Sequence, residues 1–249
     1  MLRAYRADLH IHSILSPCTE VVEMSPRAIV RRSVEAGLNL IAVCDHTSCE
    51  NVPALQKAAA AAGLAVLAGM EIATREEIHI LGLFGSASRA FEVQTVVYEH
   101  LPGENDEKAF GCQVAVNEQE EVVSFNKKLL IGATTLSLEA VVDLIHSRGG
   151  IAVASHIDRE AYSIMSQLGF VPPGLALDAL EVSPATGVDE ARQRFPGLDH
   201  LPFIGSSDAH SLDGIGSSST EFLMEDAGID EVKLALAGRE GRKVLGVRG

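Results

Sequence analysis

The segment Asp8-Leu9-His10-Ile11-His12 places one acidic and two imidazole side chains at every second position of an otherwise apolar run. Successive side chains of a β-strand point to opposite faces, so we expect the three polar residues on one face and Leu9 and Ile11 on the other. Two neighbouring imidazoles at a strand end suit a divalent metal, although a pair of surface histidines on an edge strand carries the same pattern. The rest of the chain decides between these two interpretations.

Short runs rich in Val, Ile and Leu alternate along the chain with longer stretches of helical periodicity. This alternation is typical of strands connected by crossover helices in a parallel sheet, so we predict an α/β fold. The predicted strands are residues 7–12, 38–44, 65–71, 77–84, 150–155, 177–182, 202–206 and 221–224. The predicted helices are residues 25–36, 51–62, 91–100, 137–147 and 230–237, two of which begin at a serine that can cap the first turn.

The stretch 86–135 is less regular, and we interpret it as an insertion over the sheet within a single domain that spans residues 1–249. No repeat or Gly/Ser-rich linker argues for a second domain. The first residues contain no uninterrupted apolar stretch, so we expect no signal peptide, no membrane span and a cytoplasmic location. The four cysteines form no CxxC pair and are expected to be reduced thiols.

The charge balance bears on the class of partner. The chain has 20 Lys and Arg against 34 Asp and Glu, which gives a formal net charge of −14. This charge repels a polyanion unless bound cations reverse it locally. Aromatic residues make up 4% of the chain and Trp is absent, so few side chains can stack on bases. The composition therefore disfavours a general nucleic-acid coat protein.

Side chains that can bind metals recur at or near the ends of the predicted strands. They are Asp45 with His46, Glu71, His79 within the fourth strand, His156, and Asp208 with His210. In closed α/β barrels the carboxyl ends of the strands converge on one face, so residues far apart in sequence become neighbours in one pocket. Burying so many charged and imidazole groups together is costly unless cations compensate them. We therefore predict a metal centre.

The same residues resemble the successive motifs of the PHP family, named for polymerase and histidinol phosphatase. The motifs are Asp8-Leu9-His10-Ile11-His12-Ser13, Cys44-Asp45-His46, Gly69-Met70-Glu71 with His79, His156, and Asp208-Ala209-His210. They cover residues 8–210 in the order of the family. The resemblance implies a distorted, seven-stranded (β/α)7 TIM-like barrel. It also implies two or three divalent metal ions, commonly manganese, iron or zinc, and hydrolysis of phosphoric ester bonds.

The resemblance also assigns metal ligands. One ion would be held by His10, His12, Glu71 and Asp208, and a second by Glu71, His79 and His156, with Glu71 bridging. His46 and His210 fall where the family holds a third ion.

The ligands of the third ion are not decided by the resemblance. Full three-metal members usually supply a further His or Asp from the loop after the first strand, and this chain has neither at the corresponding place. Here Cys18, Glu20 or Glu23 could take that place, or the position could be empty.

Three more side chains receive roles outside the ligand set. Asp8 and Asp45 are expected to orient His10, His46 or a bound water. Arg159, three residues after His156, could clamp a phosphate with its guanidinium, or could equally pair with Asp158 or Glu160.

A proton donor to the leaving oxygen is also expected. If the third metal position is empty, His46 or His210 could take that role.

The resulting hypothesis is a metal-dependent phosphoesterase in which a metal-activated water attacks the phosphate. The negative charge favours a small phosphomonoester or nucleotide as substrate, and an exonuclease acting on oligonucleotides or a strand end is the alternative. A second alternative is a non-catalytic module, because PHP domains also occur as parts of bacterial DNA polymerases and some have lost ligands and activity. Residues 161–173 fit either a lid over the pocket or a helix on the barrel rim.

Overall fold

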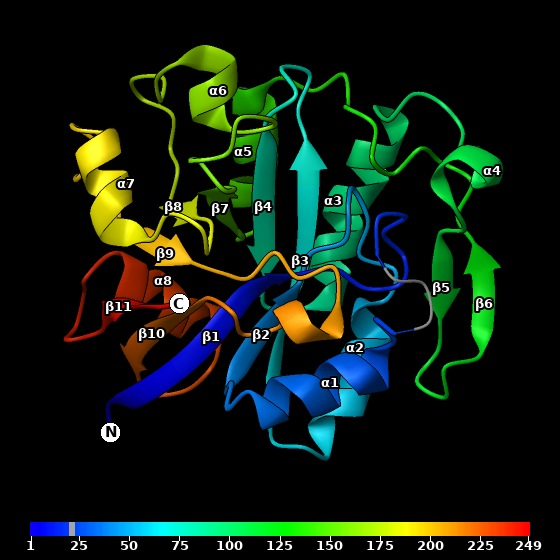
Figure 1. Cartoon of the computed structure of the whole chain (residues 1–249), viewed down its shortest axis with the longest axis horizontal. Coiled ribbons are helices and arrows are strands. Elements are labelled where there is room, and N and C mark those ends of the chain that lie inside the picture. Colours follow the sequence, from blue (N-terminus) through cyan, green and yellow to red (C-terminus); the bar gives the residue numbers. More distant parts are fainter. Residues whose placement is uncertain (20–22) are drawn as a thin grey trace.

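The computed structural model describes residues 1–19 and 23–249, which form one large sheet surrounded by helices (Figure 1). The strands of this sheet are β1 (Arg3–Ile11), β2 (Leu40–Val43), β3 (Ala65–Ala73), β4 (His79–Phe84), β7 (Ile151–Ala154), β8 (Ala179–Val182), β9 (Phe203–Gly205), β10 (Ser219–Met224) and β11 (Lys243–Arg248). The helices are α1 (Pro26–Glu35), α2 (Val52–Ala60), α3 (Ala87–Glu99), α4 (Glu107–Phe110), α5 (Leu138–Ser147), α6 (Ile164–Leu168), α7 (Val188–Arg194) and α8 (Ile229–Leu236). The predicted α/β class is confirmed.

The sheet is mixed, so the expectation of a parallel sheet is confirmed for part of it only. Its order in the described residues is β11-β10-β1-β2-β3-β4-β7-β8-β9. β1, β2 and β3 are parallel, as are β7, β8 and β9, whereas β4 is antiparallel to both of its neighbours and β10 is antiparallel to β1 and β11. Only residues 74–78 separate β3 from β4, and a parallel connection needs a dozen residues or more. Consequently β4 begins at the edge where β3 ends.

The two ends of the sheet meet, which makes a nearly closed barrel (Figure 1). The hydroxyl of Thr220 in β10 accepts a hydrogen bond from the N–H of Gly205 in β9. It also donates one to the carbonyl of Gly205, and both bonds are 2.9 Å long. A side chain at Gly205 would collide with Val247 of β11, so a glycine is needed where the two ends approach. The predicted TIM-like barrel is confirmed as a class, but the described residues contribute nine strands to it because β10 and β11 add an antiparallel pair.

The barrel interior is apolar over most of its length. Inward-pointing residues of successive strands form one buried cluster, which includes Leu67, Leu83, Val153 and Phe222. Helix α8 contributes Val232 to the same cluster. The polar site described below lies at one edge of this apolar interior.

The outer faces of the strands are covered by helices. Ile29 of α1 and Leu55 of α2 pack on Val43 of β2, and Ile145 of α5 packs with Ile80 of β4. These contacts fix the ends of the strands from outside, so the loops that follow them start from rigid positions.

The predicted helices are confirmed to within a few residues, and α3 extends further towards its N-terminus than predicted. It begins at Ala87 because the hydroxyl of Ser86 accepts a hydrogen bond from the N–H of Arg89. No helix in the described part of the chain is long and apolar enough to cross a membrane.

Several short elements were not predicted. Within the stretch 86–135 the chain forms a separate hairpin of β5 (Val114–Val116) and β6 (Val122–Phe125), in which β5 is buried and β6 is exposed. The strand β11 was also missed, because its side chains are partly exposed and Gly246 interrupts its apolar pattern.

Candidate metal centre

The polar site lies where the carboxyl ends of the parallel strands meet the beginning of β4. His10 belongs to β1, His12 follows it directly, and Glu71 lies in β3. His79 is the first residue of β4 and reaches the same edge because that strand runs in the opposite direction. The loops after β2, β7 and β9 supply the other side chains, which are His46, His156, Asp208 and His210. The structure therefore brings together the eight residues that were predicted to bind metals.

Glu71 lies at the centre of this group. It is 1% exposed, and its carboxylate oxygens face five imidazoles. The shortest distances are 2.9 Å to His79 Nδ1, 3.0 Å to His46 Nδ1, 3.3 Å to His156 Nε2, 3.4 Å to His10 Nε2 and 3.6 Å to His12 Nε2. Although burial raises the pKa of Glu71, the charges of His79 and His10 hold that pKa well below its usual value, so the carboxyl group is ionised.

Asp208 is the second carboxylate of the site that faces imidazole rings. Its Oδ1 lies 3.0 Å from His12 Nε2 and 3.2 Å from His10 Nε2. Burial raises the pKa of Asp208, but the charge of His10 and the hydrogen bond with His12 keep it well below its usual value. Its backbone φ of +50° is unusual for a residue other than glycine, and the loop holds the carboxylate in this position.

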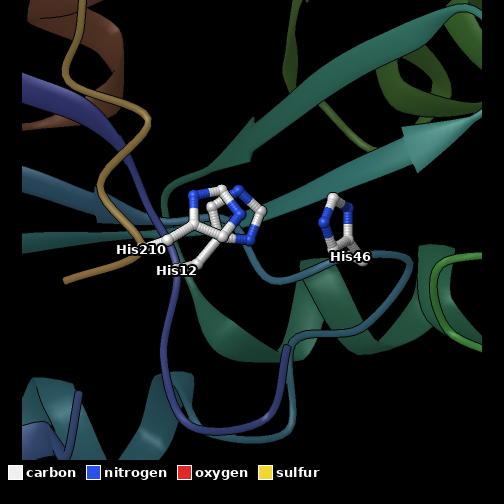
Figure 2. A group of neighbouring side chains, drawn as sticks. All are labelled: His12, His46 and His210. Atoms are coloured by element: carbon white, nitrogen blue, oxygen red, sulfur yellow. The ribbon is translucent and has the colours of Figure 1, made fainter. Parts of the chain in front are cut away.

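The imidazoles also face one another. His10 Nε2 and His12 Nε2 are 3.1 Å apart, and the rings of His12 and His210 stack with centroids 4.1 Å apart (Figure 2). Burial lowers the pKa of His12 well below its usual value, and the charges of His210 and His46 lower it further, so this ring is neutral. Neutral imidazole is the form that binds metals.

This donor set fits divalent metal ions. Lone pairs of nitrogen and oxygen that converge at such distances repel one another unless a proton or a cation lies between them. In the described part of the chain, three groups of ligand atoms each lie within 4.8 Å of one another: His12, His46 and His210; His10, His12 and Asp208; and His46, Glu71 and His79. Imidazole and carboxylate ligands suit manganese, iron and zinc.

Glu181 is a site residue that the sequence analysis missed. Its carboxylate lies 3.0 Å and 3.2 Å from His10 Nδ1 and accepts a hydrogen bond of 3.1 Å from the backbone N–H of His156. Burial lowers the pKa of His10, but the charge of Glu181 raises it well above its usual value. In the sequence, Glu181 could have been noticed as a single acidic residue inside the apolar run Ala179–Val182. In the structure, it occupies an inward-pointing position of β8.

Asp45 acts on the site through serine hydroxyls. It accepts hydrogen bonds from the N–H and hydroxyl of Ser13, at 2.7 and 2.6 Å, and from the hydroxyl of Ser16 at 2.7 Å. Ser16 Oγ lies 3.0 Å from His12 Nδ1 and accepts a hydrogen bond of 3.2 Å from the N–H of His46. Asp45 therefore fixes the ring of His12 and the backbone of His46 rather than the ring of His46.

The predicted alternation along the first segment is wrong. The pairing of β1 with β2 is irregular between Asp8 and Ile11. As a result, Leu9 packs inside the barrel and Ile11 packs towards α1 and α2, so these two residues do not share a face.

The same irregularity changes the role expected of Asp8. Its carboxylate accepts hydrogen bonds from the backbone N–H groups of Ser207 at 3.0 Å and Gly216 at 2.9 Å, and burial raises its pKa to about 6. In the described residues it orders the loop that carries Asp208, whereas the ring of His10 is oriented by Glu181. Asp8 also accepts a hydrogen bond of 3.5 Å from the backbone N–H of His10, so it contacts the main chain of that residue and not its ring. The other role expected of Asp8, orienting a bound water, stays a prediction.

Arg159 pairs with a residue that the sequence analysis did not propose. Its Nη1 lies 2.6 Å from Asp208 Oδ2, while Asp158 accepts hydrogen bonds from Ser183. Of the two alternatives for Arg159, pairing with Asp158 or Glu160 is therefore not what the structure shows, and the phosphate clamp stays a prediction.

The site opens into a pocket of about 440 Å³. Its lining includes Arg159, Tyr162 and Cys18 together with the metal-centre side chains. Burial raises the pKa of Cys18, but hydrogen bonds with His210 and His46 lower it to about 7. Glu23 is exposed, and Glu20 lies outside the described residues.

Comparison with known families agrees with this geometry. Residues 8–168, more than half of the chain, match the model of the family described as PHP domain. The chain belongs to the PHP family. Residues 199–242 also match a model described as PHP-associated.

Two curated relatives and one solved structure extend the comparison. YqxK of Bacillus subtilis (strain 168), described as an uncharacterized protein, is 26% identical over 255 residues, or 96% of this PHP chain and 63% of the relative. A 5'-3' exoribonuclease of Haemophilus influenzae (strain ATCC 51907 / DSM 11121 / KW20 / Rd) is 37% identical over 79 residues, or 30% of this chain and 27% of the relative. The matched regions thus span less than two thirds of either relative. The lesion-specific endonuclease PfuEndoQ of Pyrococcus furiosus shares the fold, with a TM-score of 0.76 at 18% identity over 99% of this chain and 59% of that structure.

Proposed function

We propose that the protein is a metal-dependent phosphoesterase whose substrate is a small phosphomonoester or a nucleotide. The observation that carries this proposal is the convergence of six imidazoles on the two ionised carboxylates of Glu71 and Asp208 at one pocket. A site of this kind needs cations for its own stability, and cations beside an open pocket attract phosphate. Membership of the PHP family supports the same reaction class.

The resemblance to the PHP family suggests a ligand assignment, which the short distances between these side chains support. The proposed ligands are His10, His12, Glu71 and Asp208 for one ion, Glu71, His79 and His156 for a second, and His46 and His210 for a third. Glu71 is suited to bridging the first two ions because its Oε2 faces His12, a proposed ligand of the first, and its Oε1 faces His79, a proposed ligand of the second. Cys18 lies beside His46 and His210, so its thiolate is available to the third ion.

When bound, a pair of divalent ions lowers the pKa of water to give a nucleophile and offsets negative charge on the phosphate. The protein's part is to hold the ligands in place. Glu181 keeps the Nε2 of His10 turned towards Asp208, and Asp45 does the same for His12 through Ser16.

Three side chains of the pocket are suited to act on the substrate. Arg159 presents a guanidinium beside Asp208 and can bind a phosphate oxygen. If the third metal position is empty, His46 can supply the proton for the leaving oxygen. Burial lowers the pKa of His46, but hydrogen bonds with Cys18 and Glu71 raise it to about 10, so the metal-free ring is protonated. His210 can do the same, because hydrogen bonding to Cys18 and the charge of Asp208 raise its pKa despite burial.

The test is metal content followed by hydrolysis. Protein purified without chelator should contain two or three equivalents of manganese, iron or zinc per chain by plasma mass spectrometry. It should then hydrolyse phosphomonoester model substrates in a metal-dependent manner. Protein that contains no metal after incubation with all three ions, and that hydrolyses neither monoesters nor diesters, would instead be a non-catalytic PHP module.

An exonuclease is the second candidate. The observation that favours it is the local identity with a 5'-3' exoribonuclease, supported by the shared fold with a lesion-specific endonuclease. Oligonucleotides labelled at the 3′ end separate the two candidates. Stepwise shortening together with turnover of diesters alone would establish the exonuclease and reject the phosphatase.

A further inference from the structure

Residues 159–162 form one wall of the pocket, and hydrogen bonds at both ends hold this segment in place. The N–H of Arg159 donates a hydrogen bond of 3.0 Å to the carbonyl of His156. The hydroxyl of Ser163 donates one of 2.8 Å to the carbonyl of Arg159, and Ser163 and Ile164 are buried. The wall is therefore ordered by its own contacts and by the start of α6.

Tyr162 is held in this wall in an unusual conformation. Its φ is +58°, a left-handed value that costs a residue other than glycine free energy and persists only where surrounding contacts impose it. One such contact is the hydrogen bond of 2.9 Å that its carbonyl accepts from the N–H of His79. A second is the stacking of its ring on the imidazole of His79, with centroids 4.7 Å apart and an angle of 16° between the planes.

The geometry leaves an aromatic surface free at the pocket. Tyr162 is 46% exposed although one face of its ring lies on His79, and it lines the same pocket as Glu71 and Asp208. A tyrosine face offers little to a phosphate group. It does favour another flat π system, and stacking of this kind is the usual way in which proteins hold an unpaired nucleobase. Arg159 in the same wall can hold the charged end of such a molecule.

We propose that Tyr162 is a specificity-determining residue that stacks on the nucleobase of the substrate, so that the site selects phosphate esters carrying a base over those of plain sugars. This inference rests on the proposed phosphoesterase function and narrows its substrate class to nucleotides or the terminal nucleotide of a strand. The pocket volume of about 440 Å³ lies within the range of roughly 300–1,000 Å³ that small-molecule sites occupy.

Binding of inert analogues tests this proposal without turnover. The probes are the 5′-phosphonates of adenosine and of ribose, in which a methylene group replaces the ester oxygen, and binding to the manganese-loaded protein is measured by calorimetry. We expect the adenosine analogue to bind at least fivefold more tightly, a preference in keeping with the known contribution of aromatic stacking to base binding. Tyr162→Ala should remove this preference and Tyr162→Phe should keep it within about twofold.

Controls separate binding from structure. Alanine and phenylalanine must adopt the same left-handed backbone conformation at position 162 as tyrosine does. A difference in binding between the two variants is therefore due to the aromatic ring. Tyr162→Leu covers His79 without an aromatic face and should also lose the preference, and its metal content should equal that of the natural protein. Phe170→Ala removes an exposed aromatic ring from the chain just beyond α6, outside this pocket, and should keep the preference.

The outcomes distinguish this inference from the proposed function. Equal binding of the two phosphonates, no binding of the adenosine analogue, or an unchanged preference in Tyr162→Ala would overturn the role of Tyr162, even if both natural esters are hydrolysed. Base-dependent binding without any hydrolysis would overturn the phosphoesterase and leave the role of Tyr162 standing. A 5′-phosphonate trinucleotide that binds more tightly than the mononucleotide would identify a strand end as the source of the base.

Discussion

The two halves of the barrel interior are built by the same strands but are stabilised differently. β4 begins with His79, which faces Glu71, and continues inward with Leu81 and Leu83, which pack in the apolar cluster. In the apolar half each side chain is stabilised by contact with its neighbours alone. In the polar half each charge depends on an opposite charge, a proton or a cation, so its stability varies with pH and metal. We therefore expect substitutions in the polar half to change metal binding and turnover, and substitutions in the apolar half to change the free energy of unfolding.

The largest effect is expected from Glu71→Gln, which removes the central carboxylate of the polar half. Loss of a group that only supports a ligand typically costs about 10–100-fold in metal affinity or activity. Glu71 faces five imidazoles directly, so we expect a loss of turnover greater than that range and a lower metal content. Metal analysis and phosphomonoester hydrolysis measure both quantities.

The matched control is Glu92→Gln, the same change at an exposed carboxylate on α3. It should retain metal and turnover. Circular dichroism should show Glu71→Gln folded, because the apolar half is untouched. Full turnover in Glu71→Gln would refute the proposed centre.

Leu83→Ala is the complementary change in the apolar half. Leu83 is fully buried, and replacing a buried leucine by alanine lowers the free energy of unfolding by roughly 2–5 kcal/mol. Denaturant unfolding should show this loss, while the folded protein keeps its metal content and turnover. Leu245→Ala, at an exposed position of β11, should change stability far less. If Leu83→Ala lost its metal while folded, the two halves would not be independent.

The sequence predicted the polar half better than the arrangement of the strands around it. His10, Glu71 and Asp208 could be placed together because parallel strands bring their ends to one edge whatever the intervening loops do. The direction of β4 and the irregular pairing of β1 could not be read in the same way, since both follow from contacts between strands.

Glu181 was missed for a related reason. Its role depends on lying opposite His10 across the barrel, and the two residues are separated by 171 positions in sequence. An isolated acidic residue in an apolar strand was the only local signal, and its partner becomes evident only when the barrel closes.

Glu181→Gln tests how far the polar half relies on its supporting contacts. The variant keeps the size of the side chain but removes the charge that raises the pKa of His10. Loss of a side chain that supports a metal-bound histidine typically lowers metal affinity or activity about 10–100-fold. We therefore expect the metal affinity of Glu181→Gln to fall within that range, and titration of the metal-free protein measures it. Glu190→Gln on the exposed side of α7 is the control and should bind metal normally. Unchanged affinity in Glu181→Gln would show that His10 does not need its carboxylate partner.

The smallest effect is expected at a histidine outside the metal centre. His146 in α5 lies 2.8 Å from Asp178, and this hydrogen bond raises the pKa of His146 although partial burial lowers it. Because the pKa is higher in the folded state, the pair stabilises the fold fully below the unfolded value of about 6.5, and this contribution is lost as pH rises through the folded value. The pair is partly exposed, so we expect only a few tenths of a kcal/mol.

His146→Gln is the better variant to test this pair, because Asp178 also accepts a hydrogen bond of 2.8 Å from the N–H of Ala152 and should be left in place. Unfolding of the natural protein and the variant at a series of pH values should give a stability difference that shrinks as pH rises above about 6.5. The histidines of the metal centre titrate in both the natural protein and the variant. Their contributions to the free energy of unfolding therefore cancel when the two stabilities are subtracted, because these sites lie far from His146. A difference that does not change with pH would mean that His146 acts by packing alone, leaving the pH dependence of stability to the polar half of the barrel.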